Sequence, residues 1–273
     1  MNKKQVRNIS KIIAIIVVII LIGILIMQII KKSTYKTQNP VATMEVEGFG
    51  TVKMELYPDI APETVANFIA LANNGFYNGL TFHRTIPDFM IQGGDKKGDG
   101  TGSPTLSAIN KNIEEGSTED KEYCIKGEFK ANGVENNLKH EAGVVSMARS
   151  DYSSLASTDA SLLKKGYNSA GSQFFIMTEK KTNLDGNYAA FGKVIEGMDV
   201  VEKIENVDVV TRDENATEGL NKPVNPPVIT SISVETYGVD YGLPETEEPF
   251  DYTTWMMQNY GANTTGTTSS SNE

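Results

Sequence analysis

The sequence predicts a mainly β fold, with many short antiparallel strands and two helices, preceded by one membrane-spanning helix. Short apolar runs recur through the middle of the chain, separated by stretches rich in glycine and asparagine. Two segments of that region indicate helices. Before it lies an uncharged run of nineteen residues, from Ile12 to Ile30, which can span a bilayer as a helix. This pattern favours a closed barrel with helical caps, although periodicity alone leaves a sandwich open.

The apolar run is predicted to be an uncleaved anchor, residues 12–30, between a short basic segment, residues 1–11, and a linker, residues 31–40. Ile, Val and Leu dominate the run, and it lacks the polar face that a helix of a soluble protein would show. A signal peptide would have a shorter apolar core and a small-residue cleavage site. Four basic residues precede the run and three follow it, so the positive-inside rule favours a cytoplasmic N-terminus.

The chain beyond the first 40 residues is strongly acidic. Seven Lys or Arg and no acid occur in those 40 residues, so the remainder carries 18 basic against 35 acidic side chains, a net charge of −17. Nucleic acids and anionic lipid surfaces are therefore poor partners for it, because both would repel it. Cys124 is the only cysteine, so the fold depends on its core and not on an intramolecular disulfide.

Residues 41–236 are predicted to form one domain, which begins with a hairpin and a helix. Two strands, residues 42–47 and 51–56, flank a Gly-Phe-Gly turn, and the second alternates apolar and polar side chains as a half-buried strand does. A helix then starts near Pro62, places apolar residues on one face and ends before Gly75, at the position where a C-cap glycine belongs.

The rest of this domain supplies further strands and one more helix. A short helix is predicted over residues 198–204. The apolar runs that indicate strands are residues 143–148, 173–178, 191–195 and 228–234.

Residues 237–273 are predicted to be an acidic, polar and disordered tail. No Lys or Arg follows Lys222, and the chain finishes in a Thr, Ser, Asn and Gly stretch that is too polar to form a core. Within the tail, residues 251–260 carry the only tryptophan, Trp255, beside two methionines. This segment could be a short docking element, but packing back on the domain is favoured.

The sequence FHRTIPDFMIQGGD, residues 82–95, closely resembles the signature of the cyclophilin peptidyl-prolyl isomerases. Further segments agree in the family's order, so the resemblance extends through nearly all of residues 41–236. These segments are GDGTG at 98–102, LKHEAGVVSMA at 138–148, GSQFFI at 171–176 and LDGNYAAFGKVIEGMDVV at 184–201. The resemblance implies a closed eight-stranded antiparallel barrel capped by two helices.

The same resemblance implies which residues act. Arg84 falls on the catalytic arginine, and Gln92 would steady it. The proline ring would lie in an apolar pocket, and the backbone at Ala148 and Arg149 would pair with residues preceding the proline. The substrate-binding positions implied in this way are Phe89, Met90, Gln92, Ala148, Arg149, Gln173, Phe175, Leu184 and Tyr188.

The chain departs from many eukaryotic cyclophilins at two positions and carries two insertions. Asn183 stands where those proteins have a tryptophan that helps to bind cyclosporin, so drug binding should be weak. Tyr188 replaces a histidine at the pocket rim and keeps an aromatic face with a polar tip. The insertions, around residues 103–122 and 151–167, resemble surface loops, and the second lies beside the expected groove. It could shape access or be neutral decoration.

The sequence gives no indication of a cofactor or a metal. Its two histidines, His83 and His140, lack spaced partners and are predicted to be buried structural residues. The glycines of GDGTG lack the GKS or GKT ending of a phosphate loop and the spaced acids of a calcium loop.

The function predicted is peptidyl-prolyl cis-trans isomerisation in exported proteins, on the extracytoplasmic side of a cell membrane. Amide resonance sets a barrier of roughly 18 to 20 kcal/mol for an X-Pro bond, and lowering it requires no covalent chemistry. An arginine can hydrogen-bond the prolyl nitrogen once resonance is lost, because its donors stay charged. The alternative is a membrane-tethered module that binds proline-containing segments without turnover.

Overall fold

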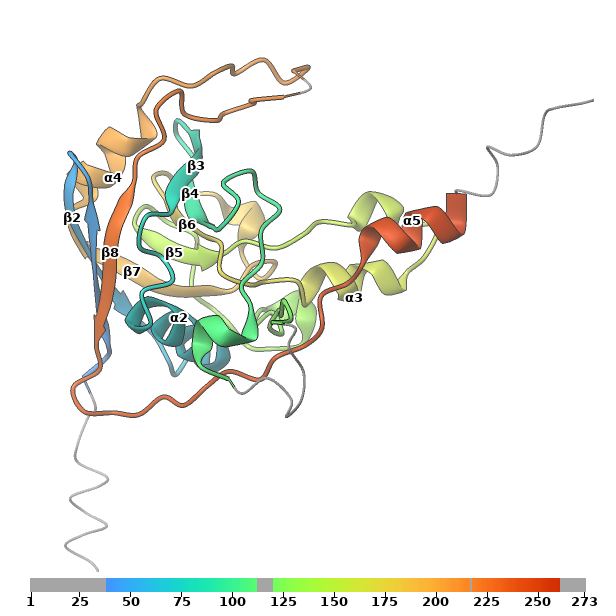
Figure 1. The fold of residues 1–273 in the computed structure, drawn as a ribbon, viewed down its shortest axis with the longest axis horizontal. Helices are drawn as coiled ribbons and strands as arrows, with labels where there is room; N and C mark the ends of the chain where they lie inside the picture. The colour runs from blue at the N-terminus through green and yellow to red at the C-terminus, as the bar shows by residue number, and fades with distance from the viewer. Residues whose placement is uncertain (1–37, 112–119, 217, 261–273) are drawn as a thin grey trace, which may run out of the picture. The chain divides into compact units, whose positions relative to one another are not determined.

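The computed structural model describes residues 38–111, 120–216 and 218–260, and its main element is an antiparallel sheet. Eight strands occur in these described ranges, in the spatial order β3-β4-β6-β5-β7-β2-β1-β8 (Figure 1). The strands are β1 Val41–Val46, β2 Gly50–Leu56, β3 Thr81–Ile86, β4 Met90–Asp95, β5 Val144–Met147, β6 Phe174–Met177, β7 Ala190–Glu196 and β8 Ile229–Glu235. The predicted mainly β fold is confirmed.

The sheet curls into a half-barrel whose two edge strands meet over a short stretch. Thr81 of β3 forms an isolated antiparallel bridge with Val228, just before β8. The Phe82 N–H donates to the Pro227 carbonyl at 2.9 Å, and the Gly79 N–H donates to the Ile229 carbonyl at 2.8 Å. The edges are therefore joined by a few bonds and not by a full ladder, which is less regular than the closed barrel that the sequence predicts.

The first hairpin forms as its alternation predicts. Val52, Met54 and Leu56 of β2 are completely buried, while the intervening side chains reach the surface. Strands β3 and β4 are different, because they contain few exposed positions and lack a regular alternation. Periodicity alone therefore does not identify them, although the motif FHRTIPDFMIQGGD covers both.

Two helices match the predicted ones, namely α2 Pro62–Asn73 and α4 Met198–Glu205. The start of α2 receives its cap from a distant residue, since Ala61 at the N-cap position has no side-chain acceptor. The carboxylate of Glu128 accepts hydrogen bonds from the Thr64 N–H at 2.8 Å and the Thr64 hydroxyl at 2.6 Å. A negative charge at this end also complements the helix dipole.

Two further helices, α3 Ser161–Tyr167 and α5 Tyr252–Tyr260, are not predicted from the sequence. Helix α3 lies in the insertion at residues 151–167, so this insertion is a folded element and not only a loop. Figure 1 shows α3 and α5 side by side, and aromatic contacts between Tyr152 and Tyr252 connect their segments.

The C-terminal region requires a correction. The predicted disorder from residue 237 onward is wrong for residues 237–260, which carry β-bridge contacts and helix α5. The Trp255 segment contacts the insertion through Tyr252, which stacks on Tyr152, although α5 has no buried residue. Residues 261–273 lie outside the described residues.

The predicted anchor, residues 12–30, also lies outside the described residues, together with the basic segment before it and most of the linker after it. Within the described ranges, every helix is too short or too polar to cross a membrane.

Candidate active site

Strands β3 and β4 place the predicted catalytic arginine beside its predicted partner. Arg84 and Gln92 are directly opposite each other in the antiparallel ladder, so their side chains lie on the same face of the sheet. The Arg84 guanidinium donates from Nη1 to Gln92 Oε1 at 3.1 Å. Strand pairing alone therefore brings the two side chains together, although eight positions separate them in the chain.

The side-chain amide of Gln173 extends this hydrogen-bonded contact and orients the Gln92 amide. Gln92 donates from Nε2 to Gln173 Oε1 at 3.1 Å. Gln173 in turn donates to the carbonyl oxygens of Gly100, at 3.0 Å, and Gly102, at 3.1 Å. The backbone of the GDGTG loop thus anchors a chain of hydrogen bonds that ends at Arg84, which restricts the positions that the guanidinium can take.

The guanidinium lies at the rim of a pocket of about 290 Å³. The pocket is lined by Arg84, Phe89, Met90, Gln92, Ala148, Arg149, Phe175, Leu184 and Tyr188. Nine of the ten positions implied by the resemblance therefore surround one cavity. The tenth, Gln173, lines the neighbouring cavity and contacts this one through Gln92.

The environment of Arg84 combines a charge with partial burial. Burial lowers the pKa of Arg84 below its ordinary value, and the electrostatic effect of the nearby Tyr188 offsets part of this shift. A guanidinium nevertheless stays protonated at any working pH. Its charge is poorly screened because apolar side chains form much of the pocket, so it can act strongly on a bound amide.

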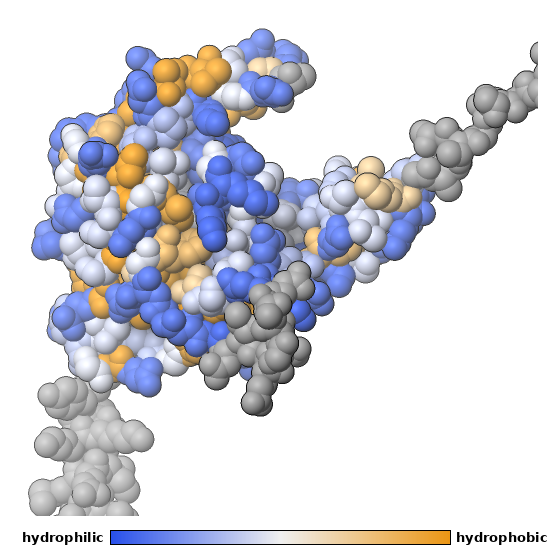
Figure 2. All heavy atoms as spheres, viewed as in Figure 1, coloured by the Kyte–Doolittle hydropathy of each residue, from blue (hydrophilic) through white to orange (hydrophobic). Residues whose placement is uncertain are grey.

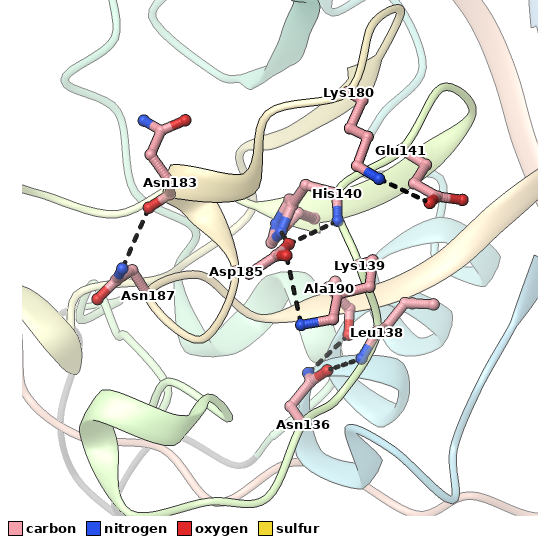
Figure 3. A network of polar contacts seen from close by, with 11 residues as sticks. Asn136, Leu138, Lys139, His140, Glu141, Lys180, Asn183, Asp185, Asn187 and Ala190 are labelled. Atoms are coloured by element: carbon pink, nitrogen blue, oxygen red, sulfur yellow. Dashed lines mark hydrogen bonds and ion pairs between the residues drawn. The ribbon is translucent and has the colours of Figure 1, made fainter.

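The floor of the pocket is an aromatic group held by buried polar contacts. The ring of Phe175 stacks on His140 at 6.1 Å and meets Tyr188 edge-on at 5.8 Å. His140 is fixed from both sides, because Nδ1 lies 3.2 Å from Asp185 Oδ1 (Figure 3) and Nε2 lies 3.2 Å from the Ser146 hydroxyl. His140 therefore positions Phe175, and its predicted structural role agrees with an exposure of 1%.

This buried histidine makes the stability of the domain sensitive to acid. Burial lowers the pKa of His140 below its usual 6.5, even though Asp185 opposes this effect. On acidification through 6.5 the unfolded chain takes up a proton that the folded chain resists, so we expect the free energy of unfolding to fall as the pH drops below about 6.5. Chemical denaturation between pH 5 and 8 measures this fall.

His83 is a second buried histidine with a lowered pKa, so it contributes to the same slope. We expect His140→Asn to destabilise the domain and to flatten the slope, while leaving the part due to His83. An unchanged slope in His140→Asn would contradict the assignment to His140.

Several contacts that Arg149 makes beside the pocket are not predicted from the sequence. The Arg149 guanidinium lies over the rings of Tyr188, at 4.6 Å, and Tyr167, at 5.1 Å. Arg149 also donates to the backbone carbonyls of Asn187 and Ser150. Tyr167 comes from the inserted helix α3, so the insertion supports a pocket residue. Only the proximity of residues 151–167 to Arg149 in the sequence could have indicated this.

Asn183 lies outside the pocket that Arg84 lines. It lines an adjoining cavity of about 310 Å³ together with Tyr152 and Leu163 of the insertion. The Asn187 side chain donates to the Asn183 carbonyl at 3.2 Å, as Figure 3 shows. Within the described ranges, no cluster of His, Cys, Asp and Glu could hold a metal ion.

Comparisons with known proteins agree with this geometry. The family model "Cyclophilin type peptidyl-prolyl cis-trans isomerase/CLD" matches residues 41–234. The chain is 39% identical over 165 residues to peptidyl-prolyl cis-trans isomerase B of Bacillus subtilis. This alignment covers 60% of this chain and 90% of that protein. It is 37% identical over 169 residues to a peptidyl-prolyl cis-trans isomerase of Synechococcus elongatus. This second alignment covers 61% of this chain and 90% of that protein.

A solved structure is also similar. A cyclophilin-type peptidyl-prolyl cis-trans isomerase from Cryptosporidium parvum, crystallised in the presence of the dipeptide Ala-Pro, matches with a TM-score of 0.53 and 26% identity. The match covers 71% of this chain and 98% of that one. With the strand order, the paired Arg84 and Gln92 and the apolar pocket already in place, these matches show that the chain belongs to the cyclophilin-type peptidyl-prolyl cis-trans isomerase family.

Proposed function

We propose that this protein accelerates X-Pro isomerisation by stabilising the twisted amide with Arg84, without covalent chemistry. The observation that carries the proposal is the guanidinium held by Gln92 at the rim of an apolar pocket. In a planar amide the nitrogen lone pair is delocalised, whereas in the twisted transition state it becomes a hydrogen-bond acceptor. A donor aimed at that nitrogen therefore binds the transition state more tightly than the ground state.

The substrate follows from the walls of the pocket. Phe89, Met90 and Phe175 offer apolar surface that suits a proline ring, and polar groups occur at the rim, where the flanking peptide bonds would pass. The Cryptosporidium relative crystallised with Ala-Pro supports a proline-containing ligand. We therefore propose that unfolded or partly folded polypeptides with accessible X-Pro bonds are the substrates.

The experiment that tests the activity is cis/trans exchange of a short Ala-Pro-containing peptide, followed by two-dimensional exchange NMR with and without the full chain. Uncatalysed exchange takes tens of seconds or longer, so catalysis makes exchange cross-peaks appear at mixing times that show none without the protein. Line broadening or shift changes without faster exchange would contradict the enzyme and favour a module that only binds.

We further propose that residues 12–30 anchor the isomerase domain to a cell membrane with the domain outside, where exported chains emerge unfolded. The support is the sequence alone, through the length of the apolar run and its flanking charges. Slow proline isomerisation limits the folding of many chains, which gives an isomerase a use at this location. Protease added to intact cells should degrade the domain, and protection of the domain from that protease would overturn the proposed orientation.

Cyclosporin should bind weakly if at all, because Asn183 offers no indole ring at the position where related proteins use a tryptophan. We expect inhibition of peptide exchange only at drug concentrations well above those of the enzyme. Asn183→Trp should lower the concentration needed for half inhibition. Stoichiometric inhibition of the unmodified protein would contradict this.

A further inference from the structure

The C-terminal segment that follows the barrel is fixed on its surface by specific bonds. We call residues 244–253 the C-terminal strap. Glu247 and Cys124 exchange two backbone hydrogen bonds, of 2.8 and 2.9 Å, in an isolated antiparallel bridge. Lys111 donates from Nζ to the Pro244 carbonyl at 3.3 Å and to the Thr246 hydroxyl at 2.8 Å. The strap is thus tied to the barrel before it reaches the active-site side.

The strap then packs against the insertion at residues 151–167. Tyr152 of the insertion stacks on Tyr252 with the ring centroids 5.4 Å apart and an interplanar angle of 9°. It also meets Phe250 edge-on at 5.6 Å, and Lys165 places its ammonium 5.8 Å from the centre of the Phe250 ring. Two segments that are additions to the barrel therefore support one another, about 100 positions apart in the chain.

A groove of about 1010 Å³ lies between the strap and the barrel. We call it the flanking groove. Its walls are residues 100–103, 120–122, 124, 148–150, 152, 169, 171–173 and 248–253. Ala148 and Arg149 line both this groove and the proline pocket, and Gln173 of the groove bonds to Gln92 of the pocket. The groove therefore adjoins the pocket and is more than three times as large.

The wall of the groove has an excess of negative charge. The strap contributes Glu248 and Asp251, and the facing end of the first insertion contributes Asp120 and Glu122. Among the described residues of the wall, the cations are Lys121 and Arg149. The Arg149 guanidinium already contacts two carbonyl oxygens and three aromatic rings (Phe129, Tyr167 and Tyr188). Figure 2 shows hydrophilic residues along the visible face between the barrel and the segments of α3 and α5.

We propose that the C-terminal strap and residues 120–122 form a specificity wall, which selects substrates that carry a basic residue two or more positions from the isomerising proline. The occupant is the flank of the same polypeptide whose proline lies in the pocket, because Ala148 and Arg149 line both the pocket and the groove. This inference rests on the proposed isomerase function. Carboxylates in a partly enclosed groove attract Lys or Arg and repel Asp or Glu.

The test compares kcat/KM of the full chain for peptides that differ at one position. Lys or Glu is placed two or three residues before or after the proline, with an Ala peptide as reference. Because exposed ion pairs are individually weak, we expect Lys to exceed Glu by about three- to tenfold at one flank. The ratio should shrink as NaCl is raised, since salt screens such pairs.

Two double variants with the same change in net charge distinguish the effect of the groove carboxylates from the effect of the protein's overall charge. Glu122→Gln with Glu248→Gln removes two carboxylates of the groove and should bring the Lys-to-Glu ratio close to one. Glu214→Gln with Glu218→Gln removes two exposed carboxylates that are not part of the groove wall, and should leave the ratio as it is.

Equal kcat/KM values for the Lys and Glu peptides at every position, with the Ala peptide still turned over, would contradict the proposed specificity wall. A preference for Lys over Glu that persists in the Glu122→Gln, Glu248→Gln variant would also contradict it. If no peptide is turned over, the isomerase proposal fails by itself. The proposed specificity wall is then tested by binding instead: the Kd values of the Lys and Glu peptides are measured by NMR titration and compared in the same way.

Discussion

Arg84→Ala should reduce kcat/KM for X-Pro exchange by about 100- to 1000-fold, the effect of removing one donor that acts mainly in the transition state. The side chain is held by Gln92 and lies at the pocket rim, so its loss leaves the apolar walls in place. Peptide affinity, measured as Kd by NMR titration, should therefore change much less than the exchange rate. Two-dimensional exchange NMR gives the rate on the same samples.

Arg84→Lys is the matched control, because it keeps the charge and loses the planar set of donors. We expect it to recover only part of the activity, since an ammonium cannot bond Gln92 and a prolyl nitrogen in the same geometry. Full activity in Arg84→Ala would refute the proposed mechanism. A parallel loss of binding and exchange would show that Arg84 acts in ground-state binding instead.

Phe174→Ala should lower the free energy of unfolding by about 3 to 5 kcal/mol, the usual cost of truncating a buried aromatic side chain. Phe174 is completely buried, and its ring packs against Phe68 at 5.6 Å, Tyr77 at 5.6 Å and Phe82 at 6.3 Å. These residues come from α2, β3 and the loop between them, so one side chain connects several elements. The free energy of unfolding of a domain is typically only about 5 to 15 kcal/mol, so the expected loss is a large fraction of the total stability.

Urea unfolding followed by circular dichroism measures this effect. Tyr237→Ala serves as the control, because Tyr237 is 44% exposed and should cost well under the amount expected for Phe174. Equal losses in the two variants would contradict a core role for Phe174. The comparison also tests β6 as a central strand, because its neighbour Phe175 faces the active site while Phe174 faces the core.

The hairpin β1–β2 and the helices α2 and α4 could be predicted from local patterns. Alternation in β2, and the Pro62 and Gly75 signals around α2, depend on residues close in sequence. Strands β3 and β4 are not predicted by periodicity, because buried and more accessible positions do not alternate along them. Their position followed from the resemblance of the motif and not from periodicity.

The residues of the candidate site could be named from the sequence, but their connections could not. The contact from Arg84 through Gln92 to Gln173 and the GDGTG backbone joins β3, β4 and two loops. Similarly, Asp185 and Ser146 fix His140 beneath Phe175, although each of these residues lies on a different segment. Such contacts depend on strand register, which residue spacing does not reveal.

The sequence by itself determined the fold class, the family resemblance and the residues around the proline pocket, because these depend on local patterns and on a motif that runs through consecutive positions. It also supplied the predicted anchor, which requires only length and apolarity. Tertiary structure alone decided that residues 237–260 fold back, that the insertion forms helix α3, and that the C-terminal strap lines a groove beside the pocket. The physical reason is that the ring of Tyr152 packs against Phe250 and Tyr252, which lie about 100 positions further along the chain, and a local sequence pattern does not reveal such a contact.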